Sequence, residues 1–225
     1  MSADATVLPA AAGRVKTASH PARGLGNPVL GMLLFITSEV MFFAGLFAAY
    51  FSIRAGHTEV INGVATHVWP PTQDVGILNP WRLTTESGAL NLIVPATVIL
   101  ILSSFVCQWG VLAIRRGDQR TFVRAISLTF VMGVAFLLLQ AYDYTVLMHE
   151  GVTLSTGLFG STYFTLTGFH GLHVLGGTLM LAAVAYRGRA GQFNARRHDM
   201  VEAVSLYWHF VDVVWIVLFS VLYLV

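Results

Sequence analysis

The sequence is poor in cysteine and in charged residues, and each shortage excludes a class of protein. Cys107 is the only cysteine among 225 residues. The chain therefore cannot form an intrachain disulfide, hold an iron–sulfur cluster or supply both thiolates of a two-cysteine copper site. Charged residues make up only 11% of the chain, whereas hydrophobic residues make up 56%. This composition has no room for a large soluble domain and is typical of a membrane protein.

The N-terminal segment lacks the pattern of a secretory signal peptide. No basic stretch leads into an apolar core with a cleavage site, and residues 1–28 are rich in Ala, Pro and Gly. We therefore interpret residues 1–28 as a flexible cytoplasmic tail. The net charge of the whole chain is only +2, which gives no indication of a nucleic-acid partner.

Long apolar runs account for most of the remaining chain. A run of this length is sufficient to cross a hydrocarbon core of about 30 Å as a helix. The sequence thus predicts an all-α polytopic membrane protein in which residues 29–225 form one bundle of five transmembrane helices. The predicted spans are residues 29–53, 88–114, 121–148, 158–186 and 201–225, and residues 55–87 form an external loop.

The predicted external loop contains a hairpin signal. The dipeptide Asn62-Gly63 tolerates positive φ angles and lies between the short segments 58–61 and 64–68. Two short segments that flank such a dipeptide are typical of a β-hairpin with a two-residue turn. We therefore expect a small hairpin on the external side.

The distribution of basic residues predicts the orientation of the spans, because cytoplasmic loops retain positive charge. Only Arg54 and Arg82 flank the predicted external loop, so 11 of the 13 basic residues lie in the tail or near the second and fourth connections. The prediction places the N-terminus in the cytoplasm and, after five crossings, the C-terminus outside. The 11 residues are Arg14, Lys16, Arg23, Arg115, Arg116, Arg120, Arg124, Arg187, Arg189, Arg196 and Arg197.

Glu39 is an acidic residue near the middle of the first apolar run. Ten residues at about 1.5 Å each place its carboxyl group about 15 Å inside the membrane. A charge at this depth costs at least about 3 kcal/mol. We therefore expect Glu39 to be protonated or to face protein, water or a lipid head group. A hydrogen-bonded acid inside a bundle is the simpler alternative to a functional acid.

The last two predicted spans carry polar faces. His170 and His173 are one helical turn apart, among glycines that permit close helix contact. In the fifth span, four polar residues fall within about 80° of arc and should face protein. Helix packing secured by these groups is the alternative to a functional role. The four residues are Glu202, Ser205, His209 and Asp212, and the sequence spacing allows His209 to meet Asp212.

These histidines and the aspartate could also bind a metal, since imidazole and carboxylate groups are suitable ligands. The sequence has no His-Glu-x-x-His motif, however, and two histidines three residues apart are common by chance. We therefore predict no metal site, no catalytic residue and no cofactor in this chain, and we expect Cys107 to be a small buried side chain.

Five segments together resemble subunit III of the haem–copper cytochrome c oxidases. They occur in the order of that family and extend over most of residues 29–225, and the five-span form is similar to actinobacterial members. The segments are GMLLFITSEVMFFAGLF (31–47), WPPTQDVGILNP (69–80), LLQAYDY (138–144), FGSTYFTLTGFHGLHVLGG (159–177) and YWHFVDVVW (207–215).

The resemblance implies a role in a bacterial plasma membrane, within an aerobic respiratory chain. In this family, subunit I holds the haems and copper and subunit II receives electrons, whereas subunit III carries no redox centre. Subunit III binds phospholipid in a cleft and supports sustained proton uptake. Glu39 matches the family's buried glutamate. Candidate lipid-cleft or structural residues are His170, His173, Glu202, His209 and Asp212, and candidate head-group ligands are Arg187, Arg196, Arg197 and His198.

The resemblance leaves several points open. Longer mitochondrial members have seven spans, and the counterparts of their first two are missing here. The third subunit of a quinol oxidase has the same fold, and the electron donor is determined in subunit II. A proton-coupled transporter could use Glu39 and Asp212 as a relay, although no inverted repeat is visible. Actinobacterial relatives lead us to expect association with a cytochrome bc complex.

Overall fold

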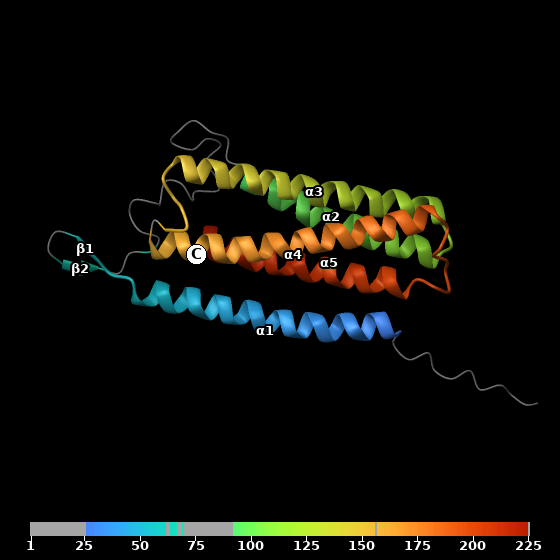
Figure 1. Cartoon of the computed structure of the whole chain (residues 1–225), viewed down its shortest axis with the longest axis horizontal. Coiled ribbons are helices and arrows are strands. Elements are labelled where there is room, and N and C mark those ends of the chain that lie inside the picture. Colours follow the sequence, from blue (N-terminus) through green and yellow to red (C-terminus); the bar gives the residue numbers. More distant parts are fainter. Residues whose placement is uncertain (1–25, 62–63, 67–68, 70–91, 156, 225) are drawn as a thin grey trace, which may run out of the picture.

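The computed structural model describes residues 26–61, 64–66, 69, 92–155 and 157–224, and its main part is a bundle of five helices (Figure 1). Each helix is long and apolar enough to cross a membrane. The prediction of an all-α polytopic protein with five spans is confirmed. The helices are α1 (Asn27–Gly56), α2 (Ile93–Arg115), α3 (Gln119–His149), α4 (Leu158–Arg189) and α5 (Asp199–Phe219), and α5 continues into the π-helical turn η1 (Ser220–Leu224).

The helix boundaries differ from the predicted spans by a few residues. Helix α1 begins at Asn27 and has Pro28 in its first turn, where a proline removes no intrahelical hydrogen bond. The last two residues of the predicted tail therefore belong to α1. Residues 1–25, 70–87 and 88–91 lie outside the described residues, so the flexible tail, most of the external loop and the start of the second span stay predictions.

The predicted β-hairpin is confirmed. Strands β1 (Glu59–Ile61) and β2 (Val64–Thr66) pair antiparallel, with Glu59 opposite Thr66. After the hairpin, the indole Nε1 of Trp69 donates a hydrogen bond of 2.9 Å to the hydroxyl of Tyr50 near the end of α1. The Trp69 ring also meets Phe159 at the start of α4, with 5.6 Å between ring centroids. Trp69 therefore connects the loop to two helices.

Helices α2 to α5 form a compact group, and α1 lies along one side of it (Figure 1). Helix α1 packs mainly against α5 and touches α4 at few positions. Only 11% of its most apolar segment is buried, against 50% in α2 and in α5. Because exposed apolar surface is stable in contact with lipid or with another protein, most of α1 is available for such a contact.

Trp208 of α5 is the centre of the four-helix packing. Its ring lies against Gly133 of α3 and Gly177 of α4, where an added Cβ would approach ring carbons to 2.6 Å and 2.8 Å. Its indole nitrogen donates a 2.9 Å hydrogen bond to the hydroxyl of Ser103 on α2. The two glycines therefore create the space that the indole ring fills.

The arginine-rich connections share one end of the bundle. The turn between α2 and α3, the turn between α4 and α5 and the start of α1 lie together, opposite the β-hairpin (Figure 1). We call this the arginine-rich end. Asp118 caps α3 there, accepting a 3.1 Å hydrogen bond from the backbone nitrogen of Thr121. The two hydrogen bonds from Thr121 lower the pKa of Asp118, and Arg124 adds a smaller effect.

Candidate functional site

Glu39 meets His173 at the contact between α1 and α4. Its Oε2 lies 3.0 Å from Nε2 of the imidazole. The other ring nitrogen, Nδ1, lies 2.7 Å from the backbone carbonyl oxygen of Phe169, one turn earlier on α4. A carbonyl oxygen only accepts hydrogen bonds, so Nδ1 carries a proton. The orientation of the imidazole is therefore determined by its own helix.

This arrangement requires one proton between Glu39 and His173. If Nε2 bears it, an imidazolium faces a carboxylate. If Oε2 bears it, a carboxylic acid donates to a neutral imidazole. The pair has no net charge in either state, which reduces the cost of placing an acid and a base inside a membrane. A proton can thus move between the two side chains without changing the charge of the site.

Aromatic rings surround the pair but leave it partly open. The ring centroids of Phe43 and His173 are 5.0 Å apart, and Phe42 stacks on the imidazole at 6.3 Å. The hydroxyl of Tyr207 donates a 3.1 Å hydrogen bond to the backbone carbonyl of His173. The side chains of His173 and Glu39 remain 15% and 18% exposed. The pair is therefore accessible from the outer surface of the bundle.

A hollow of about 150 Å³ follows the same contact between α1 and α4 towards the hairpin end. It begins at Leu46, two helical turns from Glu39, and at Leu166, two turns from His173. Its lining is mainly apolar. The hydroxyls of Thr162 and Thr165 bond to carbonyl oxygens of their own helix, so they do not need a partner from the hollow. The hollow therefore has suitable chemistry for a hydrocarbon chain.

His170 does not join the Glu39 site. Its ring is fully buried, stacks on Trp215 of α5 at 4.8 Å and meets the edge of Phe136 of α3 at 6.0 Å. Neither ring nitrogen has a hydrogen-bond partner among the described residues. Positions 170 and 173 differ by about 60° around the helix. Helix α4 contacts α3 and α5 on one side and α1 on another. This angular difference therefore places His170 in the core and His173 towards α1.

The polar face predicted on α5 contacts α2. Ser205 meets Cys107 at 3.7 Å, and His209 Nε2 lies 3.4 Å from Oε1 of Gln108. Asp212 is buried and lies near Ser104 of α2. His209 and Asp212 also interact electrostatically, as the sequence spacing allows.

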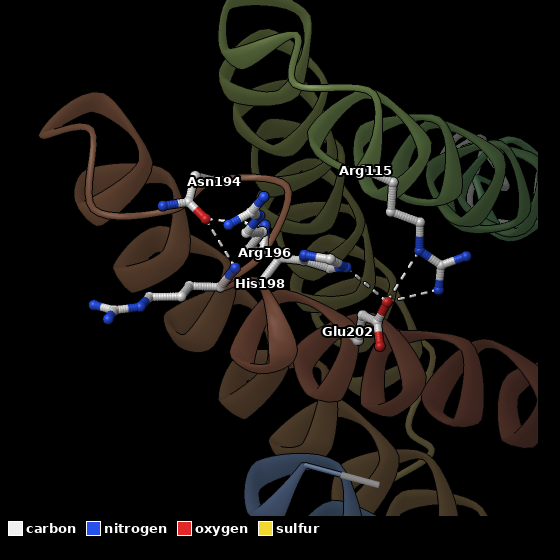
Figure 2. Close-up of polar contacts among 6 residues, drawn as sticks. Arg115, Asn194, Arg196, His198 and Glu202 are labelled. Carbon is white, nitrogen blue, oxygen red and sulfur yellow. Dashed lines mark hydrogen bonds and ion pairs between the residues drawn. The ribbon is translucent and has the colours of Figure 1, made fainter. Parts of the chain in front are cut away.

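Glu202 lies at the arginine-rich end of the same face and holds two helices and a turn together (Figure 2). Its Oε1 accepts hydrogen bonds from Nε and Nη2 of Arg115 on α2, at 3.0 Å and 2.7 Å. The same oxygen lies 3.1 Å from Nε2 of His198, one turn earlier. Arg115, His198 and Glu202 therefore form one cluster that joins α2, α5 and the turn before α5.

The arginines of the turn between α4 and α5 have different surroundings. The Asn194 side-chain oxygen accepts 2.9 Å hydrogen bonds from the backbone nitrogens of Arg196 and Arg197, which shapes the turn and leaves both side chains exposed (Figure 2). Arg187 is occupied: its guanidinium bonds to Gln192 and Met200 and lies 5.2 Å from the centre of the Phe193 ring. Arg187 therefore has partners within the chain, whereas Arg196 and Arg197 are exposed, and the role of these residues as head-group ligands stays a prediction.

A polar network that the sequence reasoning missed connects α3, α4 and η1. Gln140 donates a 3.0 Å hydrogen bond to the backbone oxygen of Thr167, whose hydroxyl lies 2.8 Å from that of Tyr144. Near it, the Tyr163 hydroxyl contacts both Asp143 and Tyr223. Positions 140, 143 and 144 have helical spacing within an apolar run, and this pattern could have identified the network.

The residues that the structure describes include no group of three or more His, Cys, Asp or Glu side chains placed to hold a metal ion. His170 and His173 face different helices, and Asp212 contacts α2. The set of ligands considered from the sequence is therefore not assembled by these helices.

Comparison with known proteins gives one consistent result. The family model described as cytochrome c oxidase subunit III matches residues 17–225. A probable cytochrome c oxidase subunit 3 of Nocardia farcinica is 40% identical over 196 residues, which cover 87% of each chain. A protein of the same description from Mycobacterium tuberculosis is 41% identical with the same coverage. Cytochrome c oxidase subunit 3 of Sus scrofa is 40% identical, over 86% of this chain and 67% of its own length.

Proposed function

Because this chain belongs to the cytochrome c oxidase subunit III family, we propose that it is the non-redox third subunit of a proton-translocating cytochrome c oxidase. In this role it stabilises subunit I, contacts subunit II, binds phospholipid and supports sustained proton uptake during oxygen reduction. Haem and copper belong to the partner subunits. The observation that carries the proposal is the Glu39–His173 pair, an acid and a base 3.0 Å apart that remain partly exposed at the bundle surface.

Two further features support this role. The exposed apolar surface of α1 offers a contact for lipid or for a partner subunit. The hollow between α1 and α4 accommodates a hydrocarbon chain near the Glu39–His173 pair. A lipid bound there would keep other molecules away from Glu39 and His173. It would also keep the surroundings of the two side chains apolar. Association with a cytochrome bc complex is part of the proposal for an actinobacterial oxidase.

The proposed function predicts a haem spectrum that depends on the partner subunits. A complex purified through a tag on this chain should contain subunits I and II, absorb as a haem protein and oxidise reduced cytochrome c. The isolated chain should be colourless. The measurement is the reduced-minus-oxidised spectrum of both preparations. Oxidation of quinol without oxidation of cytochrome c would favour the quinol oxidase alternative. A chain that purifies without haem-bearing partners and carries protons into liposomes would favour a transporter.

The proposed orientation predicts which turns an impermeant reagent reaches. With the N-terminus in the cytoplasm, the β-hairpin is outside and the arginine-rich end is inside. Glu59→Cys in β1 should react with an impermeant maleimide in intact cells, whereas Arg116→Cys should react only after permeabilisation. Native Cys107 is fully buried, so it should contribute little background labelling. If intact cells gave labelling of Arg116→Cys but not of Glu59→Cys, the proposed orientation would be wrong.

A further inference from the structure

A second hollow lies at the arginine-rich end, between the first turns of α3 and the last turn of α4. Its volume is about 330 Å³, and its lining is Gln119, Arg120, Val123, Arg124, Gly188 and Arg189. We call it the arginine hollow. At roughly 30 Å³ for each molecule of liquid water, it has space for about ten waters, or for a phosphate group with part of its ester substituents. It lies apart from the hollow beside α1.

The floor of the arginine hollow is built by close contact of the two helices. The side-chain nitrogen of Gln119 donates a 2.6 Å hydrogen bond to the backbone oxygen of Gly188. An added Cβ at Gly188 would lie 2.8 Å from the Phe122 ring and 3.3 Å from Val123. Glycine therefore brings the end of α4 against α3, and the arginines of both helices border one space.

The arginine hollow has an excess of positive charge. Arg120, Arg124 and Arg189 are exposed, and none of them forms an ion pair within the described part of the chain. Within the described residues, their side chains donate one hydrogen bond, from Arg189 to the Ser127 hydroxyl at 3.2 Å. The nearby acid, Asp118, interacts with Arg124 but is held by Thr121 as the helix cap. One carboxylate cannot neutralise three guanidinium groups.

Exposed apolar side chains continue from the arginines along both helices. On α3, Leu128, Val131 and Leu138 follow Arg124 at helical spacing and are 47%, 58% and 67% exposed. On α4, the exposed Leu175 and Leu179 precede Arg189 and lie about 40° and about 80° from it around the helix. A free anion would use only the charged end. A molecule with an anionic group and long apolar chains would use the charged end and the apolar surface together.

We propose that Arg120, Arg124 and Arg189 bind the phosphate head group of an anionic phospholipid, whose acyl chains lie along α3 and α4. Guanidinium groups suit phosphate oxygens because they donate paired hydrogen bonds in a plane. Basic hollows between transmembrane helices are chemically suited to such head groups. The site does not depend on the proposed oxidase function, because it requires only a chain that spans a membrane.

The test measures lipid binding to the purified complex after detergent has removed its lipids. Phosphatidylglycerol, phosphatidylcholine and inorganic phosphate are added separately, and bound lipid is counted by native mass spectrometry. Phosphatidylglycerol should bind more tightly than the other two. Arg124→Gln should weaken phosphatidylglycerol binding roughly fivefold, because each surface arginine contributes roughly a fivefold gain in affinity. Arg120→Gln/Arg124→Gln should therefore weaken this binding roughly thirtyfold. Arg116→Gln, which removes an arginine outside the arginine hollow, should leave binding unchanged.

Further measurements separate charge from folding and lipid from other occupants. Arg120→Lys/Arg124→Lys should retain most of the binding, and binding by the unmodified complex should weaken as salt rises. Equal binding of the two lipids, equal binding of phosphate alone, or unchanged affinity in the double glutamine variant would overturn the proposal. An acidic side chain of a partner subunit seated in the arginine hollow would also overturn it. Haem content, recorded in each preparation, tests the oxidase proposal separately.

Discussion

Trp208→Ala should cause loss of this chain from the purified complex. Trp208 is 1% exposed and fills the space that Gly133 and Gly177 leave, so the variant would create a large cavity where α3, α4 and α5 meet. Replacing a buried tryptophan by alanine typically costs about 3–5 kcal/mol. The hydroxyl of Ser103 would also lose the indole nitrogen as its partner. Retention of the chain and its thermal denaturation in detergent measure the effect.

Two variants control this prediction. Trp109→Ala changes a tryptophan on α2 that is 56% exposed and should leave the fold of the chain intact. Trp208→Phe keeps an aromatic ring but removes the hydrogen bond to Ser103, so its effect should be intermediate. A Trp208→Ala complex that retains the chain at the normal denaturation temperature would show that the packing around this ring does not hold the helices together.

Glu39→Gln and Glu39→Leu should both assemble with full haem content and then lose activity progressively during turnover. The glutamine amide can donate to His173 Nε2 but cannot ionise. Leucine leaves Nε2 without its partner from α1, at a cost of about 1–3 kcal/mol. Activity should therefore decline faster in the leucine variant. Because the redox centres are proposed to lie in another subunit, initial turnover should fall by less than about tenfold.

A double variant distinguishes proton exchange from packing. Glu39→Leu/His173→Leu removes both polar groups and restores an apolar contact between α1 and α4, which is often neutral or stabilising. If the pair only packs, this variant should keep activity as long as the unmodified complex. If the pair supports proton supply, it should fail like Glu39→Leu. Immediate loss of electron transfer in an assembled glutamine variant would contradict a supporting role. Thr37→Val, two residues away on the exposed face of α1, is the matched control.

The five helices and the hairpin were predictable because their signals are local. A long apolar run predicts a transmembrane helix, whichever other helices it packs against. The Asn62-Gly63 dipeptide likewise predicts a turn from the backbone freedom of two residues. The concentration of arginines near two connections also follows from the sequence alone, and both connections lie at the arginine-rich end. The ends of the helices were less predictable, since apolar composition changes gradually there.

The partners of the polar residues were decided by tertiary structure. The sequence determined that Glu39 lies in a membrane span and that His170 and His173 share a helix. Only the packing of α1 against α4 brings His173 to Glu39 and leaves His170 against Trp215. The arginine hollow likewise joins the start of α3 to the end of α4, where Gly188 permits contact. Such contacts depend on side chains that meet across helices, and the periodicity of one helix carries no information about its neighbour.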